Sequence, residues 1–164
     1  MPCPDAPVER PVTTFASLAD LTSAVGTELG TSEWHTVDQD RVNLFAEATG
    51  DHQWIHVDPE RAKLTPFGGT IVHGYLTLSL LPVLAKECYG VEGVAMALNY
   101  GSDKVRFPSP LPVGSAVRAT AVLVSADELP GGVVQAVVRF TVSSEAGTKP
   151  HCVAETITRF YPAA

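Results

Sequence analysis

The pattern of apolar and polar residues predicts helices in the first half of the chain and strands in the second half. From Thr14 onward, apolar residues recur three or four positions apart, which predicts a helix that ends at Gly26 or Gly30. A second helix is predicted over residues 41–48, because its apolar residues share one face. Asp38 lies just before this segment and is a good N-cap residue.

The most apolar segment is GYLTLSLLPVLAKECY, residues 74–89. A helix built from it is apolar on nearly every side, so we expect it to be buried and to bend at Pro82. Segments rich in Val, Thr and Phe predict strands over residues 31–37, 104–107, 115–125, 133–143 and 151–161. Because a buried helix needs cover, we predict an α+β domain in which an antiparallel sheet wraps around a long central helix.

The length of 164 residues fits one domain. Residues 1–13 are rich in proline and have no apolar period, which predicts a flexible tail before a single domain at residues 14–164. Edge strands of the predicted sheet invite pairing with a second copy of the chain. We therefore expect a homodimer.

Composition and charge argue against several classes of protein. Hydrophobic residues make up 45% of the chain and charged residues 18%, as in globular proteins. A net charge of −7 argues against nucleic-acid binding and against a polybasic membrane anchor. Three scattered cysteines do not form a disulfide framework, and we find no secretory signal and no apolar run long enough to span a membrane. These features predict a cytoplasmic protein with reduced thiols.

The densest group of polar residues is TGDHQWIHVDPE, residues 49–60, in a segment whose glycines and prolines are typical of a loop. A carboxylate at Asp51 and an imidazole at His56 can converge on one water molecule. Such a pair removes a proton from the water and returns one to carbon, as general base and general acid. The spacing leaves a second interpretation open, in which Asp51 caps a turn and His56 only bonds the loop.

A second candidate is the pair His73 and Gly74, where the predicted buried helix begins. The first N–H groups of a helix have no partner within it, and a glycine lets another group approach the backbone closely. An oxyanion hole for a polarised carbonyl needs both features. The alternative is a glycine that only eases the loop into the helix.

Two further patterns are weaker. His52 and His56 are four residues apart and His73 offers a third ligand, but no Glu follows the first His, so we predict no metal site. Lys104 and Arg106 alternate along a predicted strand, where a solvated face is favoured over phosphate contacts. The sequence has no glycine-rich phosphate loop and no dinucleotide fingerprint.

Residues 45–74, FAEATGDHQWIHVDPERAKLTPFGGTIVHG, resemble the motif of the MaoC-like, R-specific enoyl-CoA hydratases. That family has Gly-Asp-x-Asn-Pro-aliphatic-His-x-Asp-Pro, then a loop, then aliphatic-x-His-Gly. The matching positions are Gly50, Asp51, Ile55, His56, Asp58, Pro59 and residues 71–74. Gln53 and Trp54 replace Asn-Pro, as in a NodN-like branch, which NYGSDKVRFPSPLPVGS at residues 99–115 also resembles. The resemblance covers most of residues 31–162.

This resemblance implies a hot-dog fold, usually a homodimer, and (R)-specific enoyl-CoA hydratase or 3-hydroxyacyl-thioester dehydratase activity without a cofactor. Asp51 and His56 would hold and activate the water, and the backbone N–H of Gly74 would polarise the thioester carbonyl. Water would add at C3 and a proton at C2. The residues expected to contact substrate are Gln53, Trp54, His73, Asn99, Tyr100 and Arg106.

Three alternatives remain open at this point. The substrate is carried either by coenzyme A or by an acyl-carrier protein, since both end in the same phosphopantetheine arm. A thioesterase is disfavoured, because the only acid in the central helix is Glu87, near its far end. A non-catalytic module that binds acyl thioesters is disfavoured by the intact pair of Asp51 and His56.

Overall fold

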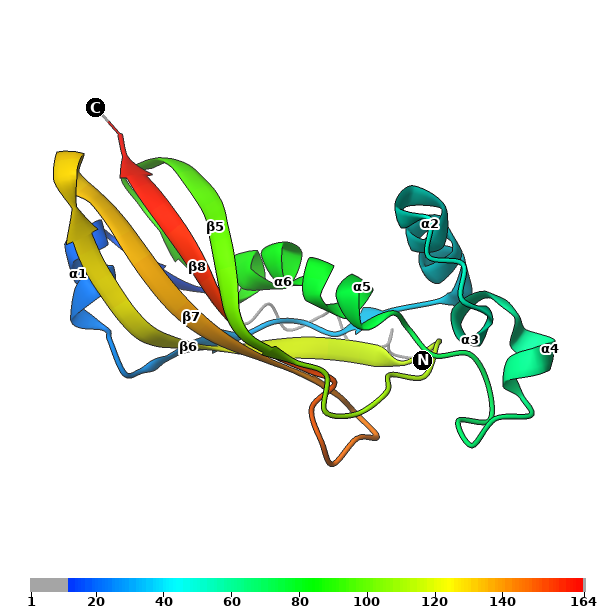
Figure 1. Ribbon diagram of the computed structural model, residues 1–164. Coiled ribbons are helices and arrows are strands. Elements are labelled where there is room, and N and C mark those ends of the chain that lie inside the picture. Colours follow the sequence, from blue (N-terminus) through cyan, green and yellow to red (C-terminus); the bar gives the residue numbers. More distant parts are fainter. Residues whose placement is uncertain (1–11, 164) are drawn as a thin grey trace, which may run out of the picture.

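A long antiparallel sheet curves around a central helix in the structure, a computed structural model that describes residues 12–163 (Figure 1). The helices are α1 (Leu18–Ser23), α2 (Gln39–Thr49), α3 (Trp54–Val57), α4 (Pro59–Ala62), α5 (Gly74–Ser79), α6 (Leu81–Cys88) and the short η1 (Pro130–Gly132). The strands are β1 (Thr13–Phe15), β2 (Glu28–Thr31), β3 (His35–Thr36), β4 (Tyr89–Val91), β5 (Val94–Arg106), β6 (Ala116–Leu129), β7 (Val133–Ser144) and β8 (Cys152–Pro162). The predicted α+β architecture is confirmed.

The main sheet has the strand order β2-β6-β7-β8-β5, with β3 also paired to β6. All of these pairs are antiparallel, whereas β1 pairs with β4 in parallel. Side chains of β7 alternate, so that Val134, Ala136 and Val138 are buried on the inner face, which covers the central helix. The other face of the sheet is called the outer face below.

Three predicted segments differ from the structure. The strand predicted over residues 31–37 is instead two short strands, β2 and β3. Strand β5 begins at Val94 rather than at residue 104, and the sequence does not reveal it because most side chains of this edge strand are exposed on both faces. The helix predicted from Thr14 is shorter, because Thr13–Phe15 pairs with β4 and Ser17 then caps α1. Residues 1–11 of the predicted tail lie outside the described residues, and Thr13 already belongs to β1.

Helices α5 and α6 together form the central helix, which the sequence predicts over residues 74–89. They meet at Leu80, and the helix is interrupted close to Pro82, which has no N–H to donate to the preceding turn. The predicted bend itself stays a prediction. Leu76 and Leu84 are buried, but Tyr75 is 70% exposed and Val83 is 45% exposed. The expectation that this helix is buried on every side is therefore wrong for the single chain.

Helix α2 ends where the loop that carries the candidate residues begins. The Asp38 carboxylate accepts a hydrogen bond from Arg41 N at 2.9 Å, which confirms the predicted N-cap. Gly50 ends the helix with φ at +79°, a left-handed conformation that glycine adopts without strain. The chain thus turns out of α2 directly into Asp51. Within residues 12–163, no helix combines the length and apolar character needed to cross a membrane.

Candidate functional site

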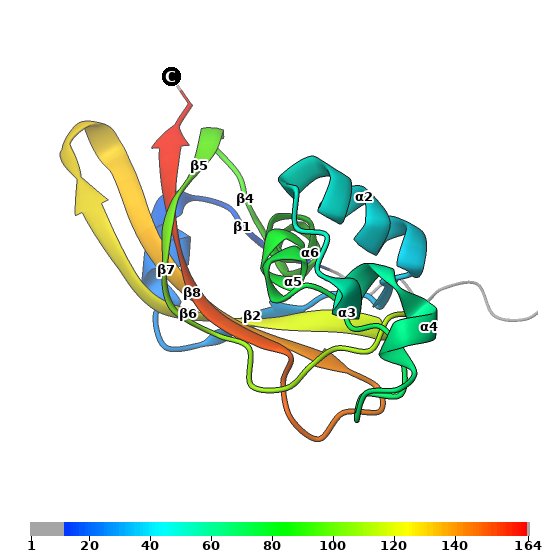
Figure 2. The same cartoon turned by 45° about the vertical axis from the view of Figure 1, so that its right-hand side comes forward.

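The candidate site lies at the start of α5, where the segment between α2 and α5 folds back on itself (Figure 2). His56 is in α3, Asp51 is in the preceding loop, and Gly74 is the first residue of α5. Two backbone-directed contacts close the segment: Ile71 N donates to Ile55 O at 3.1 Å, and His56 Nδ1 lies 2.6 Å from Ile71 O. The loop therefore brings the residues that the sequence singles out into one place.

The contact with Ile71 fixes the proton on the His56 ring. A carbonyl oxygen only accepts, so Nδ1 carries the hydrogen and Nε2 is left as the basic nitrogen. His56 is 7% exposed, and this burial lowers its pKa. Repulsion from His73 lowers the pKa further, while the Ile71 carbonyl and the Asp51 carboxylate oppose the shift. His56 is thereby held neutral at neutral pH, which is the state a general base requires.

His73 supports both candidate residues. Its ring stacks on the His56 ring, with centroids 3.8 Å apart, and Phe45 lies against it at 5.1 Å. His73 Nε2 donates to Asp51 O at 3.0 Å and lies 4.0 Å from Asp51 Oδ2. Among the residues that the structure describes, none bonds to the buried His73 Nδ1. His73 thus positions the two candidates.

Asp51 retains features of both interpretations left open by its sequence position. Its side chain is 54% exposed, so the carboxylate is accessible to a water or a ligand. Its Oδ1 also accepts a long hydrogen bond from Gln53 N, at 3.4 Å, as a turn cap does. This long contact leaves the second carboxylate oxygen available for chemistry.

Sequence reasoning missed a second layer of support, formed by Gln39 and Thr70. Gln39 Nε2 donates to His56 O at 2.8 Å, and Gln39 Oε1 accepts from Thr70 Oγ1 at 2.6 Å. Gln39 therefore connects the first turn of α2 to α3 and to the strand-like segment before α5. The signal in the sequence is its place directly after the N-cap Asp38, where a side chain can reach a neighbouring loop.

Gly74 and His56 border the same cavity, which has a volume of about 320 Å³. As the first residue of α5, Gly74 has an N–H without a partner in the preceding turn. A Cβ atom at Gly74 would lie 2.9 Å from the ring of Phe107, which also borders the cavity. Gly74 is thus required by close packing and also offers a donor to the cavity.

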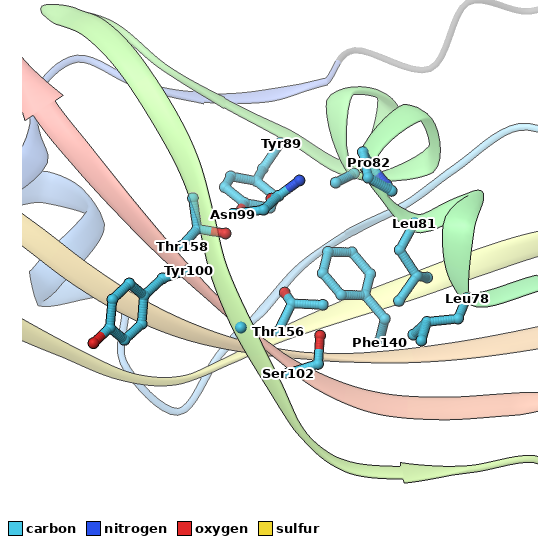
Figure 3. Close-up of a pocket in the computed structure, with 12 residues that line it drawn as sticks. Leu78, Leu81, Pro82, Tyr89, Asn99, Tyr100, Ser102, Phe140, Thr156 and Thr158 are labelled. Carbon is cyan, nitrogen blue, oxygen red and sulfur yellow. The ribbon is translucent and has the colours of Figure 1, made fainter. Parts of the chain in front are cut away.

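The other residues expected to contact substrate do not border this cavity. Gln53 is the N-cap of α3, and Trp54 stacks against the Arg61 guanidinium, 4.1 Å from the ring centroid. Arg106 is exposed at the end of β5. Asn99 and Tyr100 border a different cavity, beside the central helix (Figure 3). Asp51 and His73 are also not among the residues that border the cavity, but their side chains lie directly beside the His56 ring.

The histidines that the sequence offers as metal ligands are only partly grouped in the structure. His52 is not grouped with the other histidines; its Nδ1 lies 3.8 Å from Glu47 Oε1. Asp51, His56 and His73 each offer a ligand atom within 4.8 Å of the others, but His56 and His73 each use one ring nitrogen for a backbone carbonyl. The absence of a metal stays a prediction.

The remaining polar residues singled out above form ion pairs away from the cavity. Lys104 Nζ lies 2.9 Å from Glu155 Oε2, which agrees with a structural face of the sheet. Glu87 accepts from His35 Nε2 at 2.9 Å and from Glu33 N at 3.1 Å. The acid of the central helix is therefore bonded to the segment around β3, away from the loop that carries Asp51.

The chain is similar to known proteins over most of its length. Residues 20–145 match the family model described as MaoC like domain. The chain is 59% identical to the 3-hydroxyacyl-thioester dehydratase Z of Mycobacterium tuberculosis, over 90% of this chain and 97% of that relative. It is 49% identical to nodulation protein N of Rhizobium leguminosarum, over 87% and 89%. The R-hydratase PhaJ1 of Pseudomonas aeruginosa shares the fold, with a TM-score of 0.68 at 23% identity, over 92% of this chain and 88% of that one.

Proposed function

Because the chain belongs to the MaoC-like dehydratase family, we propose that it is a hydro-lyase that interconverts trans-2-enoyl and (3R)-3-hydroxyacyl thioesters. The observation that supports this reaction is the shared cavity of His56 and Gly74. It lets a base and a carbonyl-binding N–H act on one substrate. The strength of the family assignment comes from the relative at 59% identity, a 3-hydroxyacyl-thioester dehydratase by name.

The proposed reaction assigns one task to each group. The Gly74 N–H donates to the thioester oxygen, which makes C3 electrophilic and stabilises the enolate that forms. His56 Nε2 and the Asp51 carboxylate hold a water molecule and take one proton from it. Its oxygen bonds to C3 as the C2–C3 π bond breaks, and the proton returns to C2. Every atom of the water ends in the product, so the reaction needs no redox cofactor.

The proposal covers acyl thioesters of coenzyme A and of acyl-carrier proteins, and it does not choose between the two carriers. Coenzyme A and acyl-carrier proteins present the same phosphopantetheine thioester to the cavity. Testing the acyl group on both carriers separates them, because only the kcat/KM for the physiological carrier should be high.

We also include a homodimer in the proposal. Strand β5 is an edge of the main sheet and pairs only with β8 among the described strands. On the central helix, Tyr75 and Val83 are exposed apolar residues two turns apart. An unpaired edge strand and an exposed apolar helix face are both covered if a second copy pairs there.

We further infer a reducing compartment, such as the cytoplasm. Cys88 and Cys152 are free and buried, and burial raises the pKa of each thiol to about 11. Protonated, inaccessible thiols of this kind are typical of proteins that do not form disulfides.

The test of the proposed function is hydration of crotonyl-CoA, followed as loss of the conjugated enoyl absorbance. The wild type should react, and Asp51→Asn and His56→Gln should each lose about 10²–10⁴-fold in kcat. Asp58→Asn is the matched control, because Asp58 caps α4 on the same loop and asparagine caps equally well.

Two results would contradict the proposal in different ways. Equal rates for the wild type and Asp51→Asn would remove Asp51 from the mechanism. Tight binding of enoyl thioesters without turnover, on coenzyme A and on a carrier protein alike, would indicate a non-catalytic acyl-thioester-binding module.

A further inference from the structure

A second cavity, of about 240 Å³, lies between the central helix and strands β5 and β8 (Figure 3). One wall is apolar and comes from the central helix and β7: Leu78, Leu81, Pro82, Ala85 and Phe140. The opposite wall comes from β5 and β8 and carries polar side chains: Asn99, Ser102, Thr156 and Thr158. Tyr100 belongs to the wall only through its backbone side, because its ring points away and stacks with the Arg159 guanidinium.

The two cavities share no lining residue, but they lie at successive positions along two elements of the fold. On the central helix, one face carries Gly74, Leu78, Leu81 and Ala85, which are four, three and four residues apart. Gly74 borders the first cavity and the other three border the second. On the sheet, His151 just before β8 borders the first cavity, and Thr156 within β8 borders the second. A chain held at Gly74 that runs along this face of the helix is therefore directed toward the second cavity.

The spacing of residues along the helix indicates which part of an acyl chain would reach the second cavity. At 1.5 Å per residue, Leu78 lies roughly 6 Å and Ala85 roughly 16 Å beyond Gly74 along the helix axis. An extended covalent chain advances roughly 1.2 Å per bond, so the second cavity faces roughly the fifth to the thirteenth bond beyond the thioester carbonyl. A four-carbon acyl group ends before it, and a ten-carbon acyl group ends inside it.

The polar side chains of this wall are exposed or half-buried, and they make few hydrogen bonds within the described part of the chain. Thr156 Oγ1 makes one long bond, to Val138 O at 3.5 Å, whereas the side chains of Asn99, Ser102 and Thr158 have no intramolecular partner there. The hydroxyl groups of Ser102 and Thr156 point into the cavity in Figure 3. A saturated chain would displace water from these groups without replacing its hydrogen bonds, which is unfavourable.

We propose that this cavity holds the distal part of the acyl chain and favours chains that carry a hydroxyl or keto oxygen there over unsubstituted hydrocarbon chains. The inference rests on the proposed function, and it adds the substrate class. The helix wall contacts methylene groups, while Asn99, Ser102 or Thr158 bonds the oxygen of the chain. Such a division matches cavities in which a few polar groups set specificity on an apolar background.

The test compares kcat/KM for trans-2-decenoyl-CoA with that for its analogue bearing a hydroxyl on the last carbon. The wild type should use the hydroxylated chain at least as well as the plain chain. A wholly apolar cavity would instead disfavour the buried hydroxyl by roughly 10–100-fold. A preference for the plain chain of tenfold or more would overturn the proposal.

Variants locate the effect in the polar wall. Thr158→Val and Ser102→Ala should each lower the ratio of hydroxylated to plain kcat/KM by roughly 3–10-fold. Thr141→Val is the matched control, because Thr141 lies on the outer face of β7 and should leave the ratio unchanged. Unchanged ratios in Thr158→Val and Ser102→Ala would overturn the assignment of the oxygen to this wall.

Crotonyl-CoA separates this inference from the proposed function. Its acyl group is too short for the second cavity, so all three variants should hydrate it like the wild type. Hydration of crotonyl-CoA together with rejection of the hydroxylated chain would refute only the substrate class. Failure to hydrate any enoyl thioester would refute both the function and the inference.

Discussion

The imidazole rings of His56 and His73 are stacked, with centroids 3.8 Å apart and planes 26° from parallel. Each ring donates one N–H to a backbone carbonyl of the same loop, His56 to Ile71 and His73 to Asp51. The stack therefore connects the two ends of the loop, and the bond to Ile71 fixes which nitrogen of His56 is basic. It also means that a positive charge on one ring is repelled by a charge on the other.

The pH dependence of hydration should reflect the burial of His56 and its contact with His73. Burial lowers the pKa of His56 from its ordinary 6.5, and protonation removes the base, so kcat/KM falls as the pH drops through the lowered pKa. The midpoint of the acidic limb, measured with crotonyl-CoA, should lie below 6.5. A midpoint at or above that value would show that His56 is not the group whose protonation limits the reaction.

Two substitutions at His73 separate its hydrogen bond from its ring. His73→Phe keeps the stack but loses the donor to Asp51 O, and we expect kcat to fall about 10–10²-fold, because small displacements of reacting groups are costly. His73→Gln can keep a donor but removes the stacked ring, and its kcat should be closer to wild type. Both variants remove the imidazole charge that repels a charged His56, so the midpoint of the acidic limb should move to higher pH in each.

The readouts for His73 are kcat and the full pH profile of kcat/KM, with folding checked by circular dichroism. If both folded variants match the wild type in kcat and in the pH profile, His73 only fills space. A lower kcat in His73→Phe alone, with no change in either pH profile, would limit the role of His73 to its hydrogen bond to Asp51 O.

Gly74→Ala should damage the site without an equal effect on the fold. The added Cβ would lie 2.9 Å from the Phe107 ring, so the start of α5 or the ring must shift. We expect a loss of about 10²–10³-fold in kcat, comparable to loss of one oxyanion donor. Gly69→Ala is the control, because a Cβ there meets nothing within 4 Å.

A second substitution tests the cause. Phe107→Ala in the Gly74→Ala background makes room for the new methyl group and should recover part of the rate. If Gly74→Ala is fully active on its own, the backbone N–H of Gly74 is not confined as the packing indicates.

Gln39→Leu tests the layer behind His56. Loss of the bonds to His56 O and Thr70 Oγ1 leaves partly buried polar groups unpaired, which costs about 1–3 kcal/mol in the free energy of unfolding. The kcat for crotonyl-CoA should fall as well, because α3 loses a support. Gln135→Leu removes a side-chain bond to Arg159 on the outer face and should leave kcat unchanged. Denaturant unfolding and steady-state kinetics measure the two effects.

Val83→Glu tests the homodimer. It places a charge on the exposed face of the central helix, where we propose that the second copy packs, and it should raise the dimer dissociation constant at least tenfold. Val25→Glu is the matched control, because Val25 is also 45% exposed and lies on the turn after α1. Sedimentation equilibrium gives both constants, and a monomeric wild type at all concentrations would refute the dimer.

Local signals predict part of this fold well. Asp38 and Gly50 mark the ends of α2 through their own capping chemistry, which depends on few neighbours. Strand β5 was missed because it is at an edge, where side chains face solvent on both sides and no apolar alternation is needed. The exposure of Tyr75 was also not predicted, because hydropathy alone does not say which apolar side of a helix is covered by other elements.

In the candidate site, too, local patterns predict some residues and miss others. Asp51, His56 and Gly74 lie on one segment with a recognisable motif, and the structure brings them together with His73. Gln39 acts across a gap of 17 residues, so its place after the N-cap Asp38 is a signal that does not name its partner. Trp54 is predicted from its place in the motif and Arg106 from its place on a strand face, and neither borders the cavity. The catalytic roles themselves stay predictions.

The bond between His56 and Ile71 closes a loop of 15 residues, and the middle of that loop carries Leu64, which is 88% exposed. Closing a loop depends only weakly on its length, so that doubling it costs only about 0.6 kcal/mol. Insertions around Leu64 should therefore leave the two tied ends in place. The part of the segment whose length can change is thus separate from the part that holds the base.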